Sequence, residues 1–277
     1  MIHRRVLGDG VELAVTSTGP EDAPALVVGH GVASTSRFAR EAFTGPATRA
    51  GFRLVTYDLR GHGDSSPVPA AVDHALDRHV ADLDAVVAAV AGGQPVTVAG
   101  ISLGGHVAVA WAAAHAGTAR AAVACLPAWT GRAVPGEGAH AAVAAEVARA
   151  GVDGMIASFR EDDTMEPWLR TVLLRDWPVH DADSLTAALV ALDGGLAPTE
   201  AELRTLPVPL GLVAWPDDAG HPIAVAREWR DQAPRAALEE LALTALAASP
   251  EPLGAAAVRA LRALGVEPQG RRARGRP

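Results

Sequence analysis

The sequence predicts an α/β fold, in which a mostly parallel central sheet is flanked by helices and carries an inserted helical cap. Three observations support this prediction. Short apolar runs that end in glycine or aspartate alternate with segments of helical periodicity. One long stretch between two of these runs contains helical patterns only. The chain has 277 residues, 49% of them hydrophobic, which suffices for one large domain or for a core with an inserted subdomain.

The predicted strands follow one another in a regular order. A Gly-Asp-Gly turn at residues 8–10 separates two β-prone runs and predicts an initial hairpin. The later strands are short apolar runs, which is typical of strands covered on both faces. These runs are Ala25–Gly31, Phe52–Asp58, Pro95–Gly100, Ala121–Leu126, Val208–Trp215 and Ala236–Leu241.

Helical patterns connect these strands. The segment after Asp73 has one apolar stripe with alternating steps of four and three residues, formed by Leu76, Val80, Leu83, Val87 and Val90. Three aspartates lie off the stripe, namely Asp77, Asp82 and Asp84. A final helix is predicted at Pro252–Leu264. Strands and helices that alternate at this spacing predict a sheet covered by helices on both faces.

The alternation stops between Pro127 and Leu206, where successive helical patterns occur without a convincing strand. A structureless loop of about 80 residues would be improbable inside a compact domain. We therefore expect a core formed by residues 1–126 and 207–265 and a helical cap at residues 127–206. Aromatic residues of the cap should pack onto the core, and Trp129 is expected to line a pocket. The basic residues 266–277 predict a disordered tail.

Composition excludes several classes of function. The formal charge of −8 argues against nucleic acid as a main ligand. Cys125 is the only cysteine, so no internal disulfide can form. No apolar segment approaches roughly 18 residues and the N-terminus lacks an apolar signal core, so we expect a cytoplasmic protein without a membrane span. No H-x-x-H or H-E-x-x-H pattern suggests a metal, and no cofactor is expected. The oligomeric state stays open.

The segment Gly100–Gly104, with the sequence Gly-Ile-Ser-Leu-Gly, lies between a predicted strand and a predicted helix. This pattern is typical of a nucleophile elbow, a sharp turn that exposes a serine hydroxyl at the end of a sheet. The strand and the helix approach closely on either side of Ser102, and glycines at both positions avoid a clash. Gly105 extends this space. The sequence therefore presents Ser102 as a candidate nucleophile.

Two further motifs occur in order with the elbow, namely "VVGHGVAS" and "YDLRGHGDSS". As a set, the three motifs resemble the capped branch of the α/β-hydrolase superfamily. The resemblance implies that Ser102 is the nucleophile and that the backbone N–H groups of Val32 and Leu103 form an oxyanion hole. It also implies supporting roles for His30 and Gly31 in the loop before Val32. His62 is expected to support the turn that contains it.

The resemblance places the catalytic acid after the next-to-last strand. The sequence "VAWPDDAGHP" offers Asp217 and Asp218 there, and the spacing to the following proline favours Asp218. As an alternative, both aspartates are turn residues or helix caps before Pro222, which suits a first helical position.

The resemblance also predicts a catalytic histidine after the last strand, but "ALTALAASPE" contains none and no histidine follows His221. His221 is the leading substitute, although a base so close to the acid needs an unusual backbone path. His106 should point along its helix, away from the pocket, and His180 could reach the site from a solvated loop of the cap. The remaining candidates are expected at the surface; they are His74, His79, His115 and His140.

These observations leave three functions open. The first is a serine-dependent acyl hydrolase or acyltransferase that acts on a small to medium, apolar ester, thioester or lactone with a non-standard or absent base. The second is a non-hydrolytic enzyme of the same fold, of the lyase, cyclase or isomerase type, that uses the oxyanion donors without an acyl-enzyme. The third is a catalytically silent binding protein. An apolar small molecule is the expected partner in each case.

Overall fold

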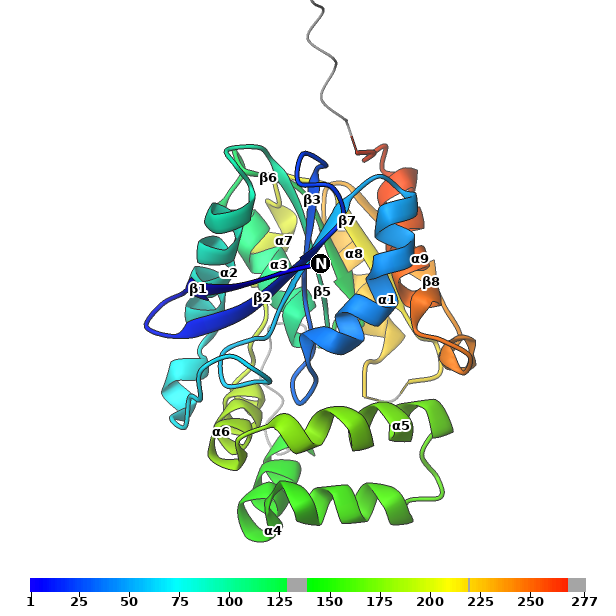
Figure 1. Ribbon diagram of the computed structural model, residues 1–277. Helices are drawn as coiled ribbons and strands as arrows, with labels where there is room; N and C mark the ends of the chain where they lie inside the picture. The colour runs from blue at the N-terminus through cyan, green and yellow to red at the C-terminus, as the bar shows by residue number, and fades with distance from the viewer. Residues whose placement is uncertain (129–138, 219, 269–277) are drawn as a thin grey trace, which may run out of the picture.

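The computed structural model describes residues 1–128, 139–218 and 220–268. Its described part contains one eight-stranded sheet with the order β1-β2-β4-β3-β5-β6-β7-β8 (Figure 1). The strand β2 pairs antiparallel with β1 and β4, and the remaining neighbours are parallel. The strands are β1 Ile2–Leu7, β2 Glu12–Thr18, β3 Ala25–Gly29, β4 Arg53–Tyr57, β5 Val96–Ile101, β6 Ala119–Cys125, β7 Leu210–Ala214 and β8 Ala236–Glu240. The predicted mostly parallel sheet is confirmed.

Helices cover both faces of this sheet (Figure 1). On one face, α1 (Ser36–Arg49) and α9 (Glu251–Ala263) share an apolar cluster with β3, β4 and β6. On the other face, α2 (Leu76–Val90), α3 (Leu103–Ala114) and α8 (Ile223–Gln232) share a second cluster. The central strands β3, β4, β5 and β7 are buried along their whole length, which explains why their sequences are apolar runs and do not alternate.

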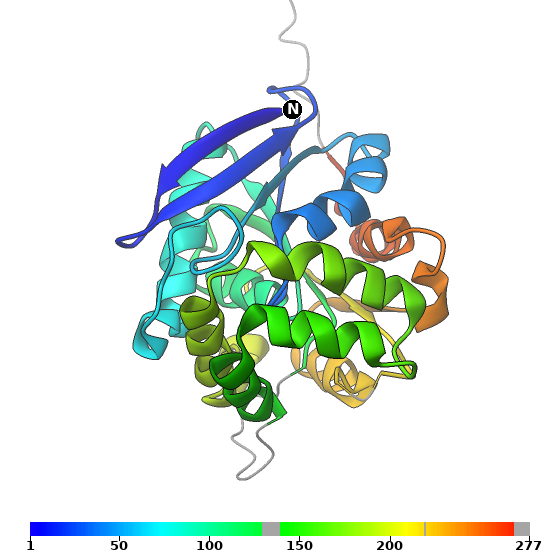
Figure 2. The same cartoon turned by 60° about the horizontal axis from the view of Figure 1, so that its bottom comes forward.

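The chain between β6 and β7 forms helices α4 (Ala139–Glu161), α5 (Pro167–Asp176), α6 (Ala182–Asp193) and α7 (Glu200–Arg204). Three of them, α4 to α6, lie together at one end of the sheet, with α4 and α5 side by side (Figures 1 and 2). They surround a separate apolar cluster that includes Met155, Phe159 and Trp177. We call residues 139–193, from the start of α4 to the end of α6, the cap. Gly151, with a φ of 68°, breaks α4 into two helical pieces.

The prediction that His74 and His79 lie at the surface was wrong, and Asp82, which lies off the apolar stripe of α2, is buried as well. Asp82 is buried, because it forms an ion pair with the buried guanidinium of Arg60 at 2.7 Å from Arg60 Nε to Asp82 Oδ2. His79 lies on the same helix face and is also buried, and so is His74 just before the helix. The apolar stripe alone could not predict this wider buried face, because the guanidinium that pairs with Asp82 comes from the turn after β4.

The C-terminal segment joins the core at its start. Val266, at the beginning of the predicted tail, is 6% exposed and packs into the cluster around α1 and α9. Residues 269–277 of the predicted tail lie outside the described residues. In the described part of the chain, no helix has both the length and the apolar character needed to cross a membrane.

Candidate active site

Ser102 lies at the turn between β5 and α3, with a φ of 50° and a ψ of −118°. This backbone conformation is strained for a non-glycine residue, and such strain occurs at sites where the surrounding structure enforces it. A Cβ at Gly100 would lie 2.0 Å from the carbonyl carbon of Gly104, and a Cβ at Gly104 would lie 2.5 Å from the His30 oxygen. The two glycines therefore allow the close approach of β5, α3 and the loop after β3 that presents the hydroxyl.

His221 contacts both Ser102 and Asp218. Its Nε2 lies 3.1 Å from Ser102 Oγ, and its Nδ1 lies 2.7 Å from Asp218 Oδ2. Since a carboxylate only accepts hydrogen bonds, Nδ1 carries the proton and Nε2 is left to accept from the serine hydroxyl. The three side chains thus form one hydrogen-bonded chain from a carboxylate, through an imidazole, to a hydroxyl.

The acid and the base come from one loop, between β7 and α8. The Gly220 N–H donates to Asp218 Oδ1 at 2.8 Å, which holds the carboxylate from the side of the following chain. Burial alone would raise the pKa of Asp218, but hydrogen bonds from His221 and Gly220 outweigh burial and hold the pKa below its ordinary value. His221 therefore reaches both Asp218 and Ser102 although it follows the acid by only three residues. Asp217 is exposed, and its carboxylate lies 3.4 Å from the Leu243 nitrogen.

The loop after β3 lies beside the nucleophile. A Cβ at Gly31 would lie 3.4 Å from the Ser102 Cβ, so the loop backbone passes directly over the hydroxyl-bearing residue. The Gly104 N–H donates to the His30 oxygen at 3.1 Å and ties this loop to the first turn of α3. Within the described residues, the N–H groups of Val32 and Leu103 have no hydrogen-bond acceptor. Both N–H groups are therefore available to a ligand.

His30 and His62 use both ring nitrogens in hydrogen bonds. His30 lies within hydrogen-bond distance of the Gly31 oxygen through Nδ1, at 2.7 Å, and accepts from the Leu59 N–H through Nε2, at 2.9 Å. His62 lies 2.9 Å from the Arg60 oxygen through Nδ1 and accepts from the loop after β3 through Nε2. Burial lowers the pKa of both rings. Each ring is therefore neutral and oriented by the backbone, and neither is free to move a proton.

His106 joins the two ends of the inserted segment between β6 and β7. Its Nδ1 lies 2.7 Å from the Leu196 oxygen, and its Nε2 accepts from the Ala128 N–H at 3.1 Å. Burial lowers the pKa of His106 to about 4. With both nitrogens occupied, this ring cannot serve as the base for Ser102. The sequence offered no signal for this bridge, because its partners are distant in the chain.

His180 differs from its prediction, since its loop is not solvated. The side chain is buried, and burial lowers its pKa to about 4. The ring meets the edge of His62, with 5.3 Å between ring centres. His180 thus connects the cap to the turn after β4.

Aromatic side chains lie beside the acid loop. Trp215 directly follows β7, and its ring packs edge-on against Trp168 of α5, with 6.0 Å between ring centres. Trp168 in turn stacks on Phe38 of α1 at 6.4 Å. Trp215 shares an apolar cluster with Ile101, the residue before the nucleophile. These contacts give the acid loop an apolar surround. Trp129, which was expected to line the pocket, lies outside the described residues.

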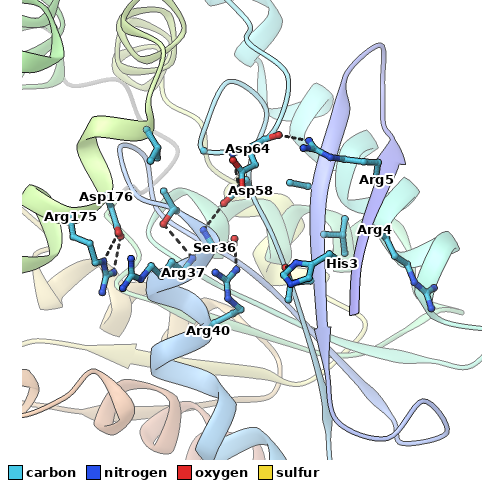
Figure 3. A pocket seen from close by; sticks show the side chains of 16 residues that line it. His3, Arg4, Arg5, Ser36, Arg37, Arg40, Asp58, Asp64, Arg175 and Asp176 are labelled. Atoms are coloured by element: carbon cyan, nitrogen blue, oxygen red, sulfur yellow. Dashed lines mark hydrogen bonds and ion pairs between the residues drawn. The ribbon is translucent and has the colours of Figure 1, made fainter. Parts of the chain in front are cut away.

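A separate cavity of about 490 Å³ lies between the β1–β2 hairpin, the start of α1 and the end of α5 (Figure 3). Its wall contains several arginines but neither Ser102 nor His221. Arg37 and Arg175 both pair with Glu41, and Arg175 also pairs with Asp176. The arginine charges are therefore largely compensated within the protein. Among the described residues, no group of three or more potential ligand side chains could hold a metal ion.

Comparisons with known proteins agree with the fold. The family model for serine aminopeptidase, S33, matches residues 20–165, which is more than half of the chain. Over 109 residues, the chain is 30% identical to proline iminopeptidase PfmaB of Pestalotiopsis fici, and the aligned segment spans 39% of this chain and only 38% of that protein.

Two solved structures are similar over most of their length. The enol-lactonase from Burkholderia xenovorans LB400 is 20% identical with a TM-score of 0.72, covering 86% of this chain and 91% of that chain. The bottromycin epimerase BotH, solved in complex with bottromycin A2, is 25% identical with a TM-score of 0.73, covering 96% and 99%. The likeness to the lactonase shows the shared fold.

Proposed function

Because the chain belongs to the serine aminopeptidase S33 family of α/β-hydrolases, we propose that it is a serine-dependent acyl hydrolase whose catalytic base is His221. The observation that carries this proposal is the hydrogen-bonded chain from Asp218 through His221 to Ser102. A distance of 3.1 Å from the imidazole nitrogen to the hydroxyl oxygen lies within the range required for proton transfer. The base thus comes from the acid loop instead of from the loop after β8.

The proposed reaction proceeds through an acyl-enzyme. Ser102 Oγ attacks the substrate carbonyl carbon while its proton passes to His221 Nε2, and Asp218 stabilises the resulting imidazolium. The negative oxygen of the tetrahedral intermediate accepts hydrogen bonds from the Val32 and Leu103 N–H groups. The intermediate then collapses, and the leaving group takes the proton from His221. Water repeats these steps on the acyl-enzyme and releases the acid.

We propose a neutral ester, thioester or lactone as the substrate class. An aminopeptidase must bind a protonated amine, which in a buried site calls for an unpaired carboxylate. Among the described residues, the buried carboxylates are already bound, since Asp82 pairs with Arg60, Asp176 pairs with Arg175, and Asp58 accepts two backbone N–H groups. The aromatic contacts beside the acid loop favour an apolar group instead.

A reaction without an acyl-enzyme, such as an epimerisation, has less support. Such chemistry needs a base that moves a proton on the substrate carbon. His30, His62 and His106 each engage both ring nitrogens with the backbone, while His221 is directed at the serine hydroxyl.

A panel of matched substrates tests the proposed class. The turnover of p-nitrophenyl butyrate, of a short-chain lactone and of proline p-nitroanilide would be measured with the wild type and with Ser102→Ala. We expect turnover of the ester or the lactone, none of the anilide, and loss of about a millionfold in turnover with Ser102→Ala. Ester turnover that survives in Ser102→Ala would reject the acyl-enzyme, and turnover of the anilide alone would reject the substrate class.

A further inference from the structure

The loop that carries the Val32 N–H is held through its own peptide group. His30 Nδ1 donates to the oxygen of Gly31, at 2.7 Å, and this carbonyl belongs to the same peptide unit as the Val32 N–H. The C=O and N–H of a trans peptide point in opposite directions. A hydrogen bond on the carbonyl therefore fixes the direction of the N–H, and it polarises the peptide so that the N–H becomes a stronger donor.

The next residue is held by a second histidine. Ala33 has a φ of 57°, a left-handed conformation that is unfavourable for a non-glycine residue. Its N–H donates to His62 Nε2 at 3.1 Å. The opposite nitrogen of His62 donates to the Arg60 oxygen at 2.9 Å, so the ring can accept only through Nε2. The strained residue that follows Val32 is thus held by a ring of fixed tautomer.

The cap supports this arrangement from the other side. The side chains of Val32 and Ala33 pack against the apolar cluster of the cap. His180 of the cap is 7% exposed, and its ring meets the edge of His62 at an interplanar angle of 84°. The Gly63 nitrogen lies 3.4 Å from His180 Nδ1. The loop after β3 is therefore enclosed between the turn after β4 and the cap, with His62 in contact with both.

We propose that His62 is a positioning residue for the Val32 oxyanion donor, and that His180 couples its position to the cap. The oxyanion hole is then complete only when the cap is seated, so a substrate that draws the cap onto the core also aligns the donor for the reaction. This role rests on the proposed function, since an oxyanion hole matters only for acyl transfer. It goes beyond support of the turn, which would make His62 important for stability alone.

The first experiment separates positioning from stability. His62→Leu removes the acceptor of the Ala33 N–H, whereas His62→Gln keeps a carbonyl oxygen that can accept it. With p-nitrophenyl butyrate, we expect the kcat of His62→Leu to fall tenfold or more while KM changes little. The inhibition constant of a boronic acid that mimics the tetrahedral intermediate should rise by a similar factor, and His62→Gln should recover part of both. An unchanged kcat in folded His62→Leu would overturn the proposal.

The second experiment tests the coupling to the cap and remains available if His62→Leu fails to fold. His180→Leu keeps the buried volume of the cap but removes the ring contact with His62, together with the contacts of the imidazole with the Gly63 nitrogen and the Ala33 backbone. Its kcat should also fall, with KM nearly unchanged, and the double variant with His62→Gln should lose less than the product of the two single effects. His140→Leu, at a half-exposed cap histidine paired with Asp193, is the matched control and should keep wild-type kcat. A loss of kcat in the double variant that equals the product of the two single losses would refute the coupling.

A third measurement does not depend on activity. Hydrogen exchange of the Ala33 amide, which donates to His62 Nε2, should become at least tenfold faster in His180→Leu than in the wild type or in His140→Leu. Equal exchange rates would refute the coupling even if the enzyme turned out to hydrolyse no ester. If the wild type hydrolyses the ester but neither variant changes kcat or exchange, the positioning role fails while the proposed function stands.

Discussion

His221 hydrogen-bonds to Asp218, which lies only three residues before it, at 2.7 Å between Nδ1 and Oδ2. The same ring reaches Ser102 from a loop that lies 119 residues further along the chain. A single turn between β7 and α8 thus supplies both the carboxylate and the imidazole of the proposed triad. This compact arrangement explains how the chain can dispense with a histidine after β8.

Replacement of His221 by Asn should abolish catalysis without unfolding the protein. The variant removes the group that accepts the Ser102 proton, and loss of the base in dissected triads costs about a millionfold in turnover. The side chain is partly exposed, so the melting temperature should change little. Ester hydrolysis and thermal melting of the purified variant provide the check. A variant that retains more than a tenth of wild-type kcat would exclude His221 as the base.

The neighbouring aspartates provide a matched pair of variants. Asp218→Asn keeps the size of the side chain but removes the charge that stabilises the imidazolium, and we expect kcat to fall by about ten thousandfold. Asp217→Asn alters an exposed carboxylate with one long contact and should leave kcat within twofold. Steady-state kinetics of the two variants decide between them. A larger loss of kcat with Asp217→Asn than with Asp218→Asn would show that Asp217, and not Asp218, is the catalytic acid.

The elbow glycines make a prediction about stability. A Cβ at Gly100 would lie 2.0 Å from the backbone of α3, whereas a Cβ at Gly117 meets no atom within 4 Å. Gly100→Ala should therefore lower the free energy of unfolding by several kcal/mol, as strongly destabilising substitutions in a protein core do. Gly117→Ala should be nearly neutral. Urea unfolding measures both, and equal midpoints for the two variants would show that the close approach of β5 and α3 is not required.

Stability should fall as the solution becomes acidic. Burial lowers the pKa of six histidines, namely His30, His62, His74, His79, His106 and His180. The unfolded chain takes up these protons near pH 6.5, whereas the folded chain does so only at lower pH. The folded state therefore keeps its full stability above pH 6.5 and loses stability as the pH falls below it. In this window, each ring that stays neutral in the folded state lowers the free energy of unfolding by about 1.4 kcal/mol for every unit by which the pH falls.

Urea midpoints at pH 7.5, 6.5 and 5.5 test this dependence. The midpoint should fall most between pH 6.5 and pH 5.5. His79 is a suitable control, because both of its ring nitrogens are buried without a partner in the described part of the chain. His79→Leu should make the decline shallower. A midpoint that stays constant from pH 7.5 to pH 5.5 would contradict the account of these buried rings.

The strands and the elbow could be predicted because their signals are local. Buried strands require apolar runs, and the turn at Ser102 requires glycines at fixed distances on either side. The base could be named only as one candidate among several. Its position depends on the contacts of Gly220 and His221 with Asp218, and nothing in the local composition specifies where this loop directs the imidazole.

The buried polar groups escaped prediction for a different reason. Asp82 and His79 look like solvent-facing residues of an amphipathic helix, yet Arg60 approaches that face from a distant turn. His106 and His180 take their partners from segments that are remote in the chain. Helical periodicity shows which residues share a helix face. It does not show which distant residue pairs with a polar side chain on that face and so allows the side chain to be buried.

The most direct test of the proposed triad is the labelling of Ser102 by a fluorophosphonate, followed by mass spectrometry of the modified peptide. The account predicts that the wild type is labelled at Ser102 and that His221→Asn, correctly folded, reacts at least a thousandfold more slowly. Wild-type protein that resists labelling, or a His221→Asn variant that is labelled at the wild-type rate, would contradict it.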